Sequence, residues 1–156
     1  MNPQEGQGPW WAALTVWGVV NSVNVLQAVG FLSRIRSGSV TLNRRLGYAM
    51  IALAVPALVA LVGFVRSQAG VVTYIGPVVY LSFVALMLAV DSIAPLEFRS
   101  PRRYGILVPY LTLFFGAILL MGLPMFAMER SLWLVTVATT VLLLASMVWA
   151  MLEGVG

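Results

Sequence analysis

Residues 46–65 read LGYAMIALAVPALVALVGFV, a run of twenty residues without a charged side chain. About 20 apolar residues in a helix cross the roughly 30 Å hydrocarbon core of a bilayer. Backbone N–H and C=O groups in lipid must find partners within the segment, and a helix provides them. This stretch therefore predicts a transmembrane helix.

Four further apolar segments have a similar length. Together, the predicted spans cover residues 10–32, 46–65, 71–90, 104–126 and 132–152. The ten-residue alternating stretches typical of a membrane β-barrel are absent from the sequence. We predict an all-α polytopic membrane protein, in which residues 1–156 form a single integral membrane domain with a bundle of five transmembrane helices.

Composition supports this class of protein. Of 156 residues, 61% are hydrophobic and 9% are charged, whereas soluble domains have about 45–50% apolar and about 25% charged residues. Too few charged groups exist to cover a soluble surface, which argues against a soluble enzyme or a nucleic-acid-binding domain. The sequence contains no Cys, His or Lys, which excludes thiol and imidazole metal ligands and a lysine Schiff base. We expect no metal, no cofactor and no nucleic-acid partner.

The arginines predict the orientation. Seven of the nine arginines fall in residues 33–45 and 91–103, and Arg66 and Arg130 lie in the other two connections. The positive-inside rule places the arginine-rich connections in the cytoplasm. We therefore expect the N-terminus outside, the C-terminus in the cytoplasm, and a multi-pass protein of the cell (plasma or inner) membrane. The two outer connections are short, so 46–65 with 71–90 and 104–126 with 132–152 are expected to form antiparallel hairpins.

A polar stripe marks the first span. Asn21, Asn24 and Gln27 recur every third residue near mid-membrane, where an amide facing lipid is costly. The first interpretation is interhelical hydrogen bonding, with hydroxyl partners among Thr73, Ser82, Thr112, Thr136, Thr139, Thr140 and Ser146. The second interpretation is a polar lining for a solute path.

Prolines inside the spans form a second set of candidates. Pro56, Pro77 and Pro109 each remove a backbone donor, which predicts helix kinks that can leave crevices. The alternative is that these prolines have no functional role, because Gly and Pro are common in membrane helices.

The predicted cytoplasmic side carries a third set of candidates, made of arginines and two carboxylates. Its members are Arg34, Arg36, Arg44, Arg45, Asp91, Glu97, Arg99, Arg102 and Arg103. Three alternatives remain open: an internal salt-bridge network, a site for anionic lipid headgroups or phosphate, and a docking surface for a partner.

Catalysis has little support, because no carboxylate lies inside a predicted span and neither a nucleophile–base pair nor a metal cluster is evident. We expect a non-catalytic structural or accessory subunit of a membrane complex, or an oligomeric scaffold, in contact with membrane lipids. The alternative is a small transporter, channel or lipid-translocating protein that uses the stripe of Asn21, Asn24 and Gln27.

Overall fold

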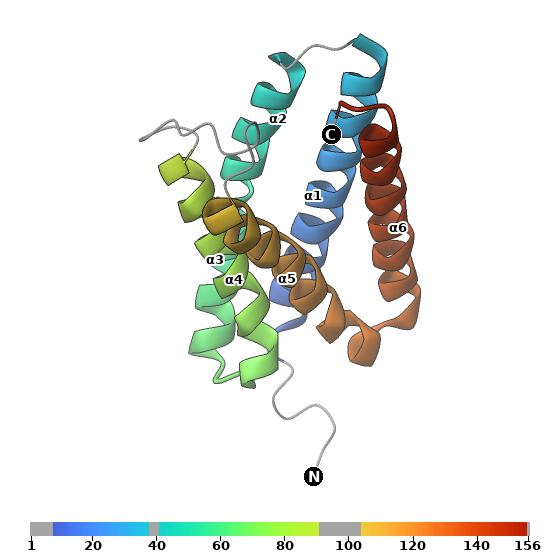
Figure 1. The fold of residues 1–156 in the computed structure, drawn as a ribbon. Helices are drawn as coiled ribbons and strands as arrows, with labels where there is room; N and C mark the ends of the chain where they lie inside the picture. The colour runs from blue at the N-terminus through green and yellow to red at the C-terminus, as the bar shows by residue number, and fades with distance from the viewer. Residues whose placement is uncertain (1–7, 38–40, 91–103, 156) are drawn as a thin grey trace.

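A computed structural model describes residues 8–37, 41–90 and 104–155 as helices joined by short connections (Figure 1). The helices are α1 (Trp10–Ser37), α2 (Thr41–Ala52), α3 (Ala54–Arg66), α4 (Val71–Leu88), α5 (Tyr104–Met128) and α6 (Arg130–Leu152). No strand occurs in these ranges. Within these described ranges, five helical segments are long and apolar enough to cross a membrane, with α2 and α3 together supplying one of them. The predicted all-α class and the five spans are thus confirmed.

The second span is interrupted at Leu53, three residues before Pro56. Pro56 has no N–H, so the Ala52 carbonyl loses its usual helical donor. The interruption is mild, because the Leu53 N–H still bonds to the Ala49 carbonyl at 3.1 Å and the Leu53 carbonyl accepts from the Ala57 N–H at 3.3 Å. Leu53 itself keeps helical dihedral angles, φ −67° and ψ −12°. Residues 45–66 therefore form one candidate span with a local defect at Leu53.

Two boundaries differ from the prediction by five residues, more than the others do. The first helix continues to Ser37 rather than ending near residue 32, and α2 already begins at Thr41. Most of the predicted connection 33–45 is therefore helical. Arginine is a good helix former and its long side chain reaches the headgroups from a helix end, so charge does not stop a helix where the apolar stretch stops.

Helices α1 and α6 form an extensive parallel pair at one side of the bundle (Figure 1). Hydrogen bonds link residues separated by a constant 115 positions: Trp17 to Leu132, Asn21 to Thr136, and Asn24 to Thr139. The steps alternate between four and three residues, which is the spacing of a left-handed helix pair. The same register sets Ala28 level with Leu143, and both are buried.

The other extensive contact joins α4 to α5. Phe83 stands at its centre, with ring centroids 5.1 Å from Tyr110 and 5.3 Å from Phe114. Further along, the two backbones almost touch, because a Cβ placed on Gly76 would lie 2.8 Å from the Leu120 carbonyl carbon and from the Met121 nitrogen. Only glycine permits this approach.

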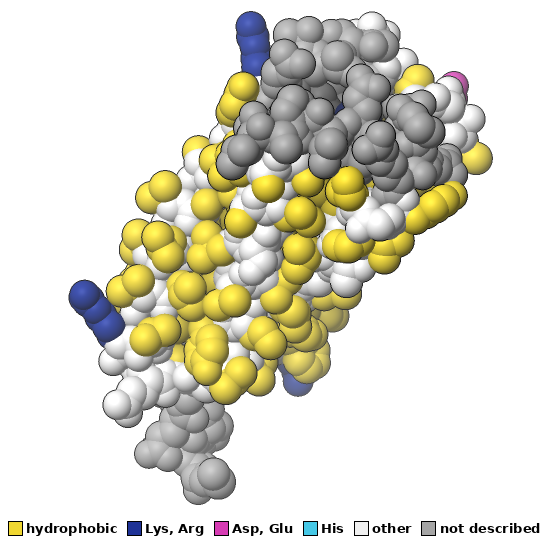
Figure 2. Space-filling view, turned by 60° about the vertical axis from the view of Figure 1, so that its left-hand side comes forward, with side chains coloured by type: hydrophobic (Ala, Val, Ile, Leu, Met, Phe, Trp, Pro, Cys, Tyr) yellow, Lys and Arg dark blue, Asp and Glu magenta, His cyan; other side chains and the backbone are white. Residues whose placement is uncertain are grey.

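The predicted hairpin partners do pack together, α3 with α4 and α5 with α6, but α4 with α5 and α1 with α6 are the larger interfaces. The flank in Figure 2 is covered by hydrophobic side chains, and the dark blue arginines on that face stand near its two ends. A bundle that meets hydrocarbon along its sides and water at its ends has this distribution.

Candidate functional site

Asn21 makes the central polar contact between α1 and α6. Its Nδ2 donates to the Trp17 carbonyl at 2.7 Å and to Thr136 Oγ1 at 3.2 Å. Its Oδ1 accepts from the Thr139 hydroxyl at 2.7 Å. Both amide protons and the carbonyl oxygen are therefore occupied within the bundle.

Asn24 lies one turn further along and is fully buried. Its Nδ2 donates to Thr139 Oγ1 at 3.1 Å and to Thr140 Oγ1 at 3.0 Å. The Thr140 hydroxyl in turn donates to the Thr136 carbonyl at 2.7 Å. The two asparagines and three threonines thus form one connected layer between α1 and α6.

One atom of this layer is left over. Asn24 Oδ1 is buried and has no hydrogen-bond partner in the described part of the chain. A buried acceptor without a partner costs about 1–3 kcal/mol. Asn24 Oδ1 is the one buried side-chain polar atom without a partner among the described residues. The energetic cost is therefore confined to the Asn24 carbonyl oxygen.

Gln27 serves a different interface. Its Nε2 donates to the Met50 sulfur of α2 at 2.8 Å, and the Tyr80 hydroxyl of α4 donates to the Met50 carbonyl at 2.7 Å. Three residues turn a helix by about 300°, so a three-residue repeat drifts by about 60° at each step. By Gln27 the stripe has rotated away from α6 and points to α2, and Met50 is held from both sides just before the interruption at Leu53.

The structure therefore divides the predicted stripe between two interfaces. Of the hydroxyl partners considered, Thr136, Thr139 and Thr140 bond to the asparagines. Thr73, Ser82 and Ser146 instead bond to carbonyls of their own helices. Two contributors were missed: Trp17, whose Nε1 donates to the Leu132 carbonyl at 2.9 Å, and Tyr80. Trp17 continues the four–three spacing of Asn21 and Asn24 and could have been found by it, whereas nothing in the sequence links Tyr80 to Met50.

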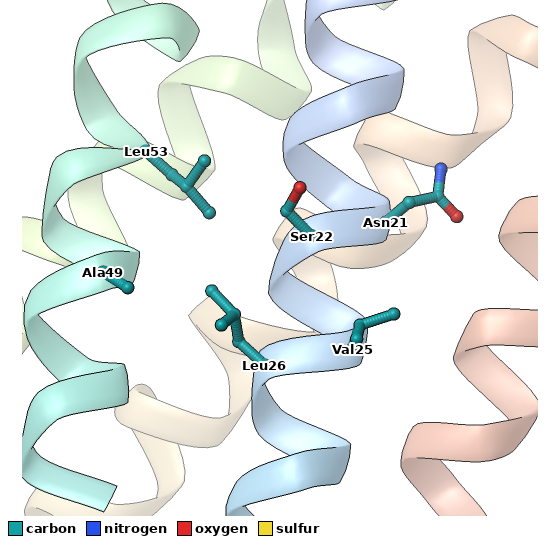
Figure 3. Close-up of a pocket in the computed structure, with 6 residues that line it drawn as sticks. All are labelled: Asn21, Ser22, Val25, Leu26, Ala49 and Leu53. Carbon is teal, nitrogen blue, oxygen red and sulfur yellow. The ribbon is translucent and has the colours of Figure 1, made fainter. Parts of the chain in front are cut away.

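A groove of about 510 Å³ lies between α1 and α2. It is next to the layer of asparagines and threonines that joins α1 to α6. Ser22 and Leu26 point from α1 toward α2, Leu53 points back toward them, and Asn21 points to the other side of α1 (Figure 3). The remaining lining residues are Val25 and Ala49. The groove is open rather than enclosed, and its walls are mainly apolar.

The predicted cytoplasmic cluster is described only in part. Arg34 is half-buried, whereas Arg36 and Arg45 are exposed, all near the α1–α2 connection. Arg44 belongs to α2, and Asp91, Glu97, Arg99, Arg102 and Arg103 lie outside the described residues. Whether the cluster forms a salt-bridge network, a headgroup site or a docking surface stays open.

The predicted kink sites occupy three different settings. Pro56 is half-buried in α3, Pro77 is buried in α4, and Pro109 is exposed in α5. Pro124 also lies inside α5 and removes the donor that would otherwise bond to the Leu120 carbonyl. The Leu120 carbonyl, which has lost this donor, lies against Gly76. The missing hydrogen bond in α5 is therefore at the place where the backbones of α4 and α5 come close together.

Titratable chemistry within the described ranges is sparse. No group of three or more His, Cys, Asp or Glu side chains that could hold a metal ion occurs there. Glu129, between α5 and α6, accepts from the Ser131 hydroxyl at 2.7 Å and from the Ser131 N–H at 3.3 Å. These two hydrogen bonds lower the pKa of the Glu129 carboxyl, and they identify it as the N-cap of α6.

Comparison of the chain with protein-family models, with curated proteins and with solved structures finds no match.

Proposed function

We propose that this protein is a non-catalytic structural or accessory subunit of a membrane complex, or an oligomeric scaffold, that binds a transmembrane helix of its partner. The observation that carries the proposal is that the side-chain amides of α1 make hydrogen bonds to other helices of the bundle. Asn21 and Asn24 bond to α6 and Gln27 bonds to α2, so the polar stripe holds the bundle together. We place the protein in the cell membrane, with its arginine-rich side toward the cytoplasm.

The groove between α1 and α2 is the proposed contact face. Ser22 and Ala49 are small residues of its lining, and Gly18 lies one turn before Ser22, where an added Cβ would meet no atom within 4 Å. Small residues four positions apart let a second helix approach closely, which is a main source of helix association in lipid. The occupant would rest on Gly18 and Ser22 and lie against Leu53.

Transport is the second candidate function, since the Ser22 hydroxyl lies in a lateral opening whose lining also includes Asn21. A polar headgroup or small solute could follow such a path. The hydrogen bonds that occupy Asn21 weigh against it, because groups that line a path must be available to the solute.

The test uses the tagged full-length chain, expressed at native level and extracted in a mild detergent. Co-eluting proteins are compared for the wild type, Ser22→Leu, which fills the groove, and Val59→Leu, which enlarges an exposed side chain of α3. We expect a stoichiometric partner, or a homo-oligomer, that is lost in Ser22→Leu and kept in Val59→Leu. A monomer without partners, or binding that is unaffected by Ser22→Leu, would contradict the proposal.

The transport alternative is tested by reconstituting the same three proteins in liposomes. Lipid scrambling or release of a small polar dye that disappears in Ser22→Leu and persists in Val59→Leu would favour transport. Absence of both activities in the wild type would remove that alternative.

A further inference from the structure

On the basis of the proposed function, we infer that the helix bound by the groove is α1 of a second copy of this chain. The two α1 helices lie parallel, with Ser22 opposite Ser22 of the second copy. Two observations lead to this partner. One is the face of α1 that the other helices leave uncovered, and the other is a hydroxyl without a hydrogen bond on that face.

The uncovered face of α1 is a single seam along the helix. Between residues 11 and 35, the exposed residues of α1 are Trp11, Ser22, Val25 and Val29. They are 11, three and four residues apart, and a heptad repeat with alternating steps of four and three residues passes through all of them. Gly18 lies on the same repeat, and an added Cβ there would meet no atom within 4 Å. Such a seam can follow a second helix along its length in a left-handed pair.

Ser22 is the polar residue at the centre of this seam. The hydroxyls of Thr15 and Ser33, on the same helix, donate to the Trp11 carbonyl at 2.8 Å and to the Gly30 carbonyl at 2.9 Å. The Ser22 hydroxyl has no hydrogen-bond partner within the described part of the chain and points across the groove toward α2 (Figure 3). A hydroxyl without a partner is unfavourable in hydrocarbon, and an acyl chain provides neither a donor nor an acceptor. The groove therefore suits an occupant that carries a hydrogen-bonding group at this depth.

A second copy provides that group by symmetry. Two copies inserted in the same direction are related by a two-fold axis along the membrane normal, which sets identical residues at the same depth. Ser22 then meets Ser22 of the second copy, and each hydroxyl can act as donor or acceptor for the other. Gly18 meets Gly18 of the second copy one turn away, where the missing side chains let the backbones approach. Residues 11–29 contain no charged side chain, so self-association brings no like charges together.

Cysteine cross-linking of the full chain in native membranes tests this pairing, because the sequence has no cysteine of its own. Under mild oxidation with copper phenanthroline, we expect Ser22→Cys and Val25→Cys to form covalent homodimers. The control, Val59→Cys, is exposed on α3 and should stay monomeric. Equal cross-linking of all three variants, or of none, would overturn the inference. If none cross-links while a different protein still co-elutes with the wild type, the proposed function stands and only the identity of the partner is wrong.

The role of the hydroxyl is tested without a covalent bond. Ser22→Ala removes the hydroxyl from the seam, whereas Thr112→Val removes an exposed hydroxyl from α5. Energy transfer between labelled copies in liposomes gives the dissociation constant of the homodimer. We expect Ser22→Ala to raise it by about 3-fold to 20-fold, as the loss of one interhelical hydrogen bond does, and Thr112→Val to leave it unchanged. An unchanged constant in Ser22→Ala, or a wild type that does not self-associate, would contradict the inference.

Discussion

At the residue scale, Asn21 and Ser22 are neighbours with opposite roles. Asn21 points to α6 and has its two amide protons and its carbonyl oxygen in hydrogen bonds. Ser22 points to the groove and is exposed. The helix turns by about 100° between them, which is enough to place one residue inside the bundle and the other at its surface.

This difference predicts the effect of Asn21→Leu on stability. Two interhelical hydrogen bonds are lost, and such bonds contribute about 0.6–1.7 kcal/mol each in membrane proteins. We therefore expect the free energy of unfolding, measured by titration with a denaturing detergent, to fall by about 1–3 kcal/mol. Ser22→Leu should change it by less than about 0.5 kcal/mol. Equal stability of the two variants would show that Asn21 does not hold α6.

At the element scale, the crossing of α4 and α5 depends on a missing side chain. Gly76 meets backbone atoms of Leu120 and Met121, which cannot move aside as a side chain can. Gly116 is the matched comparison on α5, because an added Cβ there would lie 3.8 Å from the Val79 Cγ1, an ordinary contact.

We expect Gly76→Ala to separate the two helices and to destabilise the protein by about 1–3 kcal/mol, as inserted atoms do in packed cores. Gly116→Ala should be neutral or slightly stabilising, because alanine is the better helix former. Thermal unfolding of both variants in the same detergent provides the comparison. Equal stability of Gly76→Ala and Gly116→Ala would contradict the close approach of the α4 and α5 backbones at Gly76.

The start of α6 predicts a dependence on pH. The pKa of Glu129 is lowered in the folded protein by its bonds to Ser131, so the ionised carboxylate contributes stability above the unfolded pKa. This contribution is lost as the pH falls through the folded-state pKa. The stability difference between the wild type and Glu129→Gln should be constant above about pH 5 and should shrink under more acidic conditions. A difference that does not vary with pH would exclude Glu129 as a charged cap.

At the scale of the whole molecule, the uneven arginines predict a single orientation. The sequence has no cysteine, so single cysteines can report the side of each connection. In intact cells, Ser67→Cys, between α3 and α4, should react with a membrane-impermeant maleimide. Ser37→Cys, at the end of α1, should react only after the membrane is opened. The reverse pattern would invert the topology and would place the arginine-rich end outside.

The sequence by itself determines the helical class and the five spans, because lipid provides no partners for backbone groups and forces each long apolar segment into a helix. It also predicts that Asn21, Asn24 and Gln27 face protein. Only the tertiary structure decides which helices meet. In a bilayer every outward face is apolar, so apolar periodicity does not distinguish a lipid-facing side from a helix-facing side. Packing decides three features of this molecule. Helix α1 pairs with α6 across 115 residues, and the Gln27 side chain bonds to Met50 of α2. The Asn24 oxygen is left without a partner among the described residues.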